Sequence, residues 1–266
     1  MGGAEQARSE AARVPGGRAG HGFWPYWGPY FSFLLIVSLA SGGDGAAPLG
    51  LAFQVGVPAA LLLHFARRGA YPELRGLPGG ARGIALDVLV GLLGGALWMA
   101  PYVFLPPFQA LRQLEIPFLQ AAAEQGIDPA QLGGGALAGV ALALRGLGYG
   151  LVTPFVEELF VRSWLARYVD VLDGPGDFRA LPIARFTRRS LVAVVVCFVI
   201  THLPWEWPVA LVWVLGTQLW FYHRRHLLAV VIVHAASNLG ILAAVLLASG
   251  RLAGPGGQPL DLWFFL

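Results

Sequence analysis

The chain has 266 residues, of which 56% are hydrophobic and only 12% are charged. A soluble domain carries about twice that charged fraction, so the composition excludes an ordinary soluble enzyme and predicts an all-α, polytopic helical bundle in a lipid bilayer. The 18 lysine and arginine positions are all arginine, and they lie between apolar segments rather than in one basic patch. No nucleic-acid partner is therefore expected. The single cysteine, Cys197, excludes an internal disulfide and a cysteine-based zinc site.

The chain divides into a polar start, a long apolar region and a short tail. Residues 1–22 contain no short apolar core followed by a cleavage site, so we interpret them as a disordered cytoplasmic lead-in and not as a signal peptide. Residues 23–250 form the predicted transmembrane domain, and residues 251–266 form the predicted C-terminal tail.

Several spans are predicted within this domain, because crossing a bilayer needs about 20 apolar residues. They are 24–41, 49–66, 84–105, 147–167, 190–204, 208–222 and 227–249. The apolar stretch 132–146 either extends the fourth span or forms a short re-entrant helix, so about seven to eight helices are expected. Glycines spaced four residues apart indicate close helix packing; these pairs are Gly91/Gly95, Gly135/Gly139 and Gly146/Gly150.

The arginines alternate between the predicted loops. Most of them lie before the first span and in every second loop, at 67–83, 167–189 and 223–226, whereas the longest loop between these holds Arg112 alone. The positive-inside rule therefore predicts a cytoplasmic N-terminus.

Two adjacent glutamates, Glu157 and Glu158, interrupt the fourth span and are followed by Arg162. Ionised side chains in a membrane are rare and usually functional. Residues four apart share a helix face, so Glu158 and Arg162 are predicted to neutralise each other. Glu157 has no such partner, and we expect it to face a cavity where it can accept a proton. These residues alone are equally consistent with a structural ion-pair cluster or a transporter site.

Two histidine motifs occur on later apolar segments. Phe198 precedes His202 by four residues at the end of the fifth span, and His234 precedes Asn238 by four within the seventh. A glutamate can act as general base on a water, and a histidine can orient that water or bind a metal. Histidine and asparagine can also donate hydrogen bonds to an oxyanion. The combined set favours hydrolysis, and no serine or threonine in it has an obvious base for a nucleophilic mechanism.

Three motifs in this order resemble the CPBP (ABI, CAAX-protease-like) intramembrane proteases, which include the CAAX prenyl endopeptidases. They are Glu157-Glu158-x-x-x-Arg162, Phe198-x-x-x-His202 and His234-x-x-x-Asn238, and the resemblance covers about residues 130–245. The resemblance implies that Glu157 activates water with the help of His202. It implies that His234 and Asn238 stabilise the oxyanion, and that Glu158, Arg162 and Phe198 support the site.

Metal dependence stays open at this stage. The sequence has no HExxH motif, but Glu157, His202 and His234 could supply three zinc ligands. The expected cofactor is therefore either none or zinc.

The resemblance implies an endopeptidase that cleaves a membrane-associated protein or peptide. The lysine-free composition, rich in alanine and glycine, suggests a GC-rich bacterial genome, so a bacterial inner (cytoplasmic) membrane is the expected location. A substrate with a C-terminal sorting tail, from a surface protein, suits such an origin better than a prenylated one. The alternative is a transporter or non-catalytic scaffold that uses the same cluster for binding, although the broken helices repeated in matching halves of many transporters are not visible.

Overall fold

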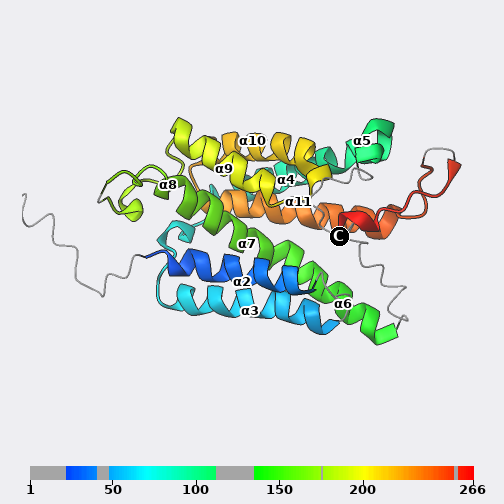
Figure 1. Cartoon of the computed structure of the whole chain (residues 1–266), viewed down its shortest axis with the longest axis horizontal. Helices are drawn as coiled ribbons and strands as arrows, with labels where there is room; N and C mark the ends of the chain where they lie inside the picture. Colours follow the sequence, from blue (N-terminus) through cyan, green and yellow to red (C-terminus); the bar gives the residue numbers. More distant parts are fainter. Residues whose placement is uncertain (1–21, 41–47, 112–134, 175, 255–256) are drawn as a thin grey trace, which may run out of the picture.

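The computed structural model describes residues 22–40, 48–111, 135–174, 176–254 and 257–266. Within these ranges the chain forms helices and no strand, which confirms the predicted all-α bundle (Figure 1). The helices of six or more residues are α2 (Trp24–Ala40), α3 (Pro48–Arg67), α4 (Gly80–Phe104), α5 (Pro106–Leu111), α6 (Gly135–Leu147), α7 (Thr153–Glu158), η4 (Leu159–Leu165), α9 (Arg188–Ile200), α10 (Trp207–Arg224) and α11 (Leu227–Ala248). Most of the predicted lead-in 1–22, and the segment that contains Arg112, lie outside the described residues.

Four of the described helical segments are long and apolar enough to cross a membrane. They are Leu49–Arg67, Gly80–Phe104, Gly135–Tyr168 and Leu227–Ala248. The other predicted spans coincide with the shorter helices α2, α9 and α10. The predicted span 190–204 is too long, because α9 ends at Ile200 and a turn leads into the short helix Pro204–Glu206.

One continuous helical run, from Gly135 to Tyr168, carries both glutamates. It comprises α6, the π-helical turn η3 (Gly148–Val152), α7, the π-helical segment η4 and the short α8 (Ala166–Tyr168). Proline has no N–H group and cannot continue the regular hydrogen-bond ladder, and the wider turn η3 ends just before Pro154. Single π-helical turns inside α-helices often mark functional sites, and here two of them bracket α7. The stretch 132–146 therefore extends the fourth helix over the residues that the structure describes.

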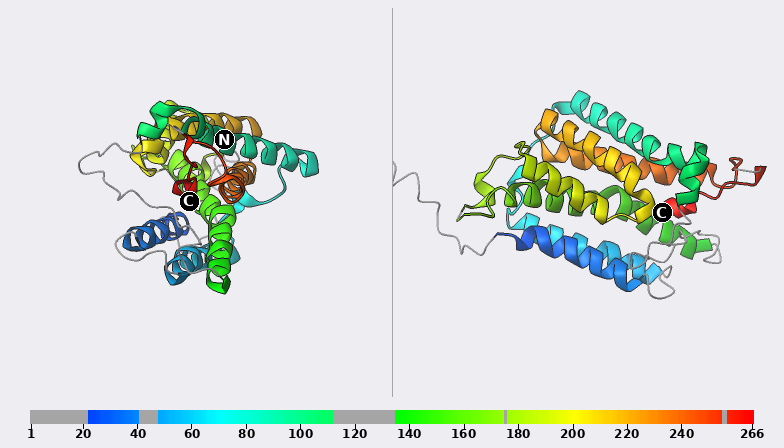
Figure 2. Two further views of the ribbon diagram at one scale, coloured as in Figure 1. Left: turned by 90° about the vertical axis from the view of Figure 1, so that its right-hand side faces the viewer. Right: turned by 45° about the horizontal axis from the view of Figure 1, so that its top comes forward.

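This run lies between two groups of helices. The antiparallel pair α2 and α3 packs on one side of it, whereas α4, α9, α10 and α11 lie on the other (Figures 1 and 2). The most extensive contact between two helices is that of α4 with α11, followed by that of α2 with α3. The run is thereby brought against α11 through α7 and against α9 through η4.

The glycine pairs differ in what they do. A Cβ atom added at Gly95 would lie 2.7 Å from the backbone oxygen of Ser237, and one at Gly91 would collide with the Val233 carbonyl. These two glycines therefore let α4 touch α11, as predicted. Gly150 likewise lies close to the Leu239 side chain, at 2.7 Å from an added Cβ.

The prediction for the pair Gly135/Gly139 is wrong, and that for the pair Gly146/Gly150 holds only at Gly150. Among the described residues, an added Cβ would meet nothing within 4 Å at Gly135 or Gly139, and at Gly146 it would make an ordinary 3.7 Å contact with Leu242. Glycines spaced four residues apart permit another helix to approach closely. Whether another helix lies there depends on how the helices of the bundle are arranged.

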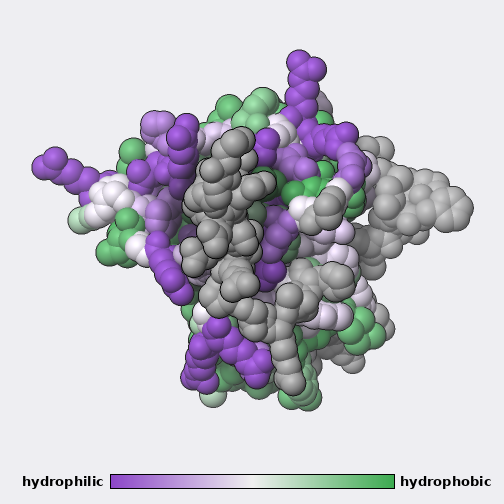
Figure 3. All heavy atoms as spheres, turned by 90° about the vertical axis from the view of Figure 1, so that its left-hand side faces the viewer, coloured by the Kyte–Doolittle hydropathy of each residue, from purple (hydrophilic) through white to green (hydrophobic). Residues whose placement is uncertain are grey.

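The loops that connect α3 to α4, α8 to α9 and α10 to α11 lie at one end of the bundle (Figure 1). Hydrophilic side chains gather on this end face (Figure 3). The arginine-bearing loops are thus on a common side, which the positive-inside pattern requires. The cytoplasmic assignment of that side stays a prediction.

Candidate active site

Glu158 is sealed in a buried ion pair. Its side chain and that of Arg162 are both 0% exposed, and a guanidinium nitrogen of Arg162 bonds directly to the Glu158 carboxylate. This confirms the pairing expected from their spacing. A charge buried so completely is tolerated when it is paired and its remaining hydrogen bonds are made.

Arg162 completes its hydrogen bonds on α10. Its Nε donates to the Oε1 of Gln218 at 3.2 Å, and its Nη2 donates to the Oγ1 of Thr217 at 2.6 Å. The guanidinium also lies 5.7 Å from the centre of the Trp213 ring. These contacts tie the α7–η4 segment to α10 in the layer of the glutamates.

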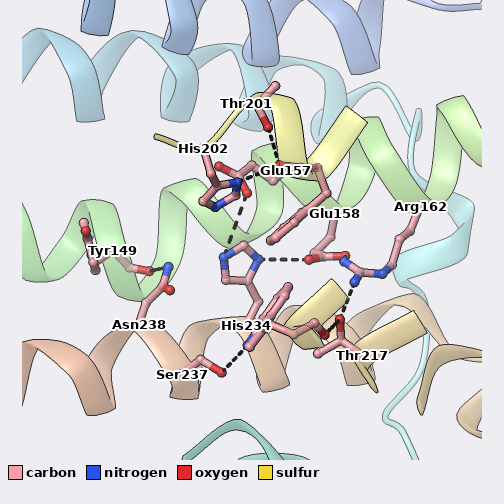
Figure 4. Close-up of polar contacts among 12 residues, drawn as sticks. Tyr149, Glu157, Glu158, Arg162, Thr201, His202, Thr217, His234, Ser237 and Asn238 are labelled. Atoms are coloured by element: carbon pink, nitrogen blue, oxygen red, sulfur yellow. Dashed lines mark hydrogen bonds and ion pairs between the residues drawn. The ribbon is translucent and has the colours of Figure 1, made fainter. Parts of the chain in front are cut away.

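His234, from the middle of α11, links the two glutamates. Its Nδ1 lies 2.9 Å from the Oε1 of Glu158, and its Nε2 lies 3.9 Å from the Oε2 of Glu157. Because Glu158 is an acceptor held by Arg162, the short contact assigns the Nδ1 proton to His234. The other ring nitrogen then faces Glu157 (Figure 4).

Glu157 opens into a cavity. Its side chain is 18% exposed, against 0% for Glu158. The cavity has a volume of about 650 Å³ and is also lined by His202, His234 and Asn238. The prediction that Glu157 faces a cavity is therefore confirmed, and the structure brings together all four residues proposed for catalysis.

His202 lies in the turn after α9 and not within the helix. Its Nδ1 is 2.7 Å from the carbonyl oxygen of Phe198, so this nitrogen carries a proton, and Nε2 is left with a lone pair in the neutral ring. The Phe198 ring packs against the imidazole with centroids 4.4 Å apart, and the Trp98 ring lies 5.3 Å away. Phe198 thus orients His202 through both its carbonyl and its ring.

Asn238 follows His234 by one helical turn and lies on the same side of α11 (Figure 4). Its Nδ2 donates to the carbonyl oxygen of Tyr149 in η3, at 3.0 Å. A carboxamide nitrogen has two hydrogens, so this bond orients the group and leaves the second hydrogen for another acceptor.

The segment predicted as a tail returns to this cavity. Phe264, Phe265 and Leu266 line it, and the hydroxyl of Tyr149 donates to the Phe265 carbonyl at 2.9 Å. Leu262 and Phe265 are only 1% and 6% exposed. Phe264, Phe265 and Leu266 thus form part of the wall around the site.

Several of these residues could not be expected from the motifs. Thr217 and Gln218 are a polar pair inside an otherwise apolar span, which was a usable signal. Trp213 and Tyr149 had no such signal, because an aromatic residue in a membrane helix is common. Trp213 packs against His234 with ring centroids 5.0 Å apart and stacks on Phe198 at 5.0 Å.

The described side chains around the cavity are not arranged as a set of metal ligands. Within the described ranges, no three His, Cys, Asp or Glu side chains are grouped so that they could hold one. Glu157, His202 and His234 share a cavity but do not form such a group in this geometry. Zinc dependence stays a prediction, and metal analysis of the purified protein tests it.

Fold and site together define a helical membrane protein with a buried polar cluster beside a cavity. Residues 139–240 match the family model described as type II CAAX prenyl endopeptidase Rce1-like. This segment contains all three motifs, and the match confirms the resemblance to the CPBP, CAAX-protease-like proteases and supports a membrane protease acting on a membrane-associated peptide. No curated protein and no solved structure matches the chain.

Proposed function

We propose that this protein is an intramembrane endopeptidase in which Glu157 activates the water that attacks a peptide bond. The observation that supports it is the unequal state of two neighbouring carboxylates. Glu158 is enclosed by Arg162 and His234, whereas Glu157 faces the cavity beside His202. Only Glu157 is free to hold a water against a substrate.

In the proposed reaction, Glu157 accepts a proton from water while the oxygen attacks the carbonyl carbon. The lone pair on His202 Nε2 accepts the other hydrogen bond of the water and orients it. The carbon–nitrogen bond then breaks, and the proton held by Glu157 passes to the leaving amine. No step in this sequence is routed through a metal.

The oxyanion is stabilised from α11. Asn238 offers the second hydrogen of its carboxamide, and His234 donates from Nε2 when its ring carries both protons. Removing one oxyanion donor typically costs about 10²–10³ in rate. Gln218 and Thr217 do not contact the substrate in this proposal. They accept hydrogen bonds from Arg162 and so hold Arg162 in place against Glu158.

The proposed substrate is a bacterial membrane protein whose C-terminal region is processed, such as a surface protein with a sorting tail. The site lies among helices that can cross the bilayer, so the substrate must present its bond at or in the membrane. Proteomic comparison of a deletion strain tests this part, since the natural substrate should accumulate uncleaved.

The decisive variant is Glu157→Gln, assayed on quenched-fluorescence apolar peptides in proteoliposomes. It keeps shape and hydrogen bonding but removes the base, so we expect at least about a 10³-fold loss of cleavage, in line with the loss of a general base and its water. Asp173→Asn is the matched control, because this side chain is 73% exposed in a loop. Thermal melting should show both variants folded.

Retained cleavage by Glu157→Gln would contradict the mechanism. A wild-type protein that binds peptides without cleaving any would favour the binding alternative, a transporter or scaffold. Metal content, measured on the same preparation, decides between water activation by glutamate alone and zinc assistance.

A further inference from the structure

Arg145 is a cationic side chain in the membrane run that the proposed mechanism does not use. It lies in α6 and lines the same cavity as Glu157. Charged residues inside membrane segments are costly and usually serve a function. A positive charge on the wall of a cavity can bind an anionic group of a ligand.

The other arginines of the bundle that are held against neighbouring helices have carboxylate partners. Arg162 pairs with Glu158, Arg167 with Glu73 at 3.3 Å, and Arg224 with Asp87 at 2.9 Å. None of the ion pairs found within the described ranges includes Arg145. Its recorded contact is with the Tyr149 ring, whose centre lies 5.7 Å from the guanidinium carbon. A structural ion-pair role therefore fits the other three but not Arg145.

The cavity wall beside Arg145 contacts a C-terminal segment of this same chain. Tyr149 lies one turn further along the helix and donates its hydroxyl to the carbonyl oxygen of Phe265. The adjacent Phe264 packs on Trp205 with ring centroids 5.6 Å apart. Backbone and apolar side chains of this chain are thus accommodated where Arg145 lines the cavity, which favours a peptide ligand over a lipid.

We propose that Arg145 binds a carboxylate of the peptide substrate and sets which bond is cleaved. This rests on the proposed function. The cation–π contact with Tyr149 holds the guanidinium in place, and a guanidinium fork matches a carboxylate with two hydrogen bonds. Arg145 acts as a specificity-determining residue and takes no part in the chemical step.

The helical geometry gives the distance between Arg145 and Glu157, and hence the distance between the bound carboxylate and the cleaved bond. Arg145 and Glu157 are twelve positions apart on one continuous helical run, which corresponds to about 18 Å at a rise of about 1.5 Å per residue. An extended peptide covers about 3.3–3.6 Å per residue. The carboxylate should therefore lie about five residues from the cleaved bond.

The experiment uses purified full-length protein in phosphatidylcholine vesicles and a set of apolar peptides. Each peptide carries one aspartate at a different position, and each has a twin with asparagine there. Mass spectrometry locates the cleaved bond. In the wild type, the bond should move with the aspartate at a spacing of about five residues. kcat/KM should exceed that of the asparagine twin by about tenfold to a hundredfold, the range for a charge-assisted hydrogen bond.

Arg145→Gln should abolish the preference for aspartate, so that each aspartate peptide and its asparagine twin are cleaved at equal rates. Arg251→Gln is the matched control, because it makes the same change of charge at an exposed arginine outside the cavity. A cleavage site that ignores the aspartate overturns the proposal, as does an equal loss on both peptide sets. A loss that appears only when phosphatidylglycerol is added assigns Arg145 to lipid phosphate and also overturns it.

A binding measurement separates this proposal from the proposed function. Fluorescence anisotropy with labelled peptides is recorded in the Glu157→Gln background, with and without Arg145→Gln. If the wild type cleaves nothing but binding still prefers aspartate through Arg145, the hydrolytic function fails and the carboxylate site stands. If cleavage occurs without that preference, the carboxylate site fails alone.

Discussion

Two regions of the molecule meet at the Glu157–Glu158 peptide, and they are built on opposite principles. The ionic region, Glu158, Arg162, Thr217 and Gln218, is buried and has its hydrogen bonds made by its own side chains. The cavity region around Glu157 leaves polar atoms of His202 and Asn238 available. His234 belongs to both. One carboxylate is held rigidly by its ion pair, and its neighbour faces the cavity in which we propose that the chemistry takes place.

The largest expected effect comes from breaking the ionic region. Arg162→Met leaves Glu158 buried without its cation, so the free energy of unfolding should fall by about 3–5 kcal/mol. Thermal and denaturant unfolding in detergent measure it. Glu157→Gln is the matched change in the cavity region and should stay within about 1 kcal/mol of the wild type, because no ion pair within the described ranges joins that carboxylate to an arginine. Equal losses of unfolding free energy in the two variants would contradict the distinction between the ionic region and the cavity region.

A smaller effect should come from the contact that positions His234. Gly95→Ala places a methyl group against the Ser237 backbone, where an added Cβ has only 2.7 Å, and should destabilise the protein by about 1–3 kcal/mol. Gly139→Ala has open space and should stabilise the helix by about 0.5–1 kcal/mol. Unfolding midpoints of the two variants should therefore move in opposite directions. A downward shift for both would mean that α6 is packed differently.

The smallest expected effect concerns an ion pair outside the membrane segments. The hydrogen bond from Arg179 holds the pKa of Asp177 below its usual value. Its contribution to stability is therefore present above the unfolded pKa of about 4 and is lost as the pH falls below it. Both side chains are 48% exposed, so the contribution should stay under about 1 kcal/mol.

Melting of wild type and Asp177→Asn between pH 7 and pH 3 checks the sign of this effect. The difference between them should shrink as the solution becomes acidic, and also in high salt, because exposed charges are screened. A difference that grows at low pH would contradict the assignment. The contrast with Arg162→Met then shows how much burial changes the role of an ion pair.

The local part of the site was predictable and the assembled part was not. The Glu158–Arg162 pair follows from helical spacing alone. The contact of His234 with Glu158 joins residues 76 positions apart, so it depends on how α11 packs against α7. The ring of Trp213 and the return of Phe265 to the cavity are long-range contacts of the same kind.

Helix ends were the weakest predictions from the pattern of apolar residues. The span 190–204 was extended to Pro204, whereas α9 ends at Ile200 and places His202 in a turn. Proline disfavours helix in the residue before it, and the Phe198 carbonyl is taken by His202. Because His202 lies in this turn, its ring lines the cavity. The predicted span had placed His202 within a continuous helix.

The sequence by itself determined that the protein is a helical membrane protein, that Glu158 and Arg162 neutralise each other, and which side chains form the candidate site. These conclusions depend on hydropathy and on spacing within one helix, and both are local properties. Only the tertiary structure decided that His234 joins the two glutamates, that Gly91 and Gly95 pack while Gly135 and Gly139 do not, and that Arg145 faces the cavity. Those outcomes depend on which helices become neighbours, and packing between distant segments determines that.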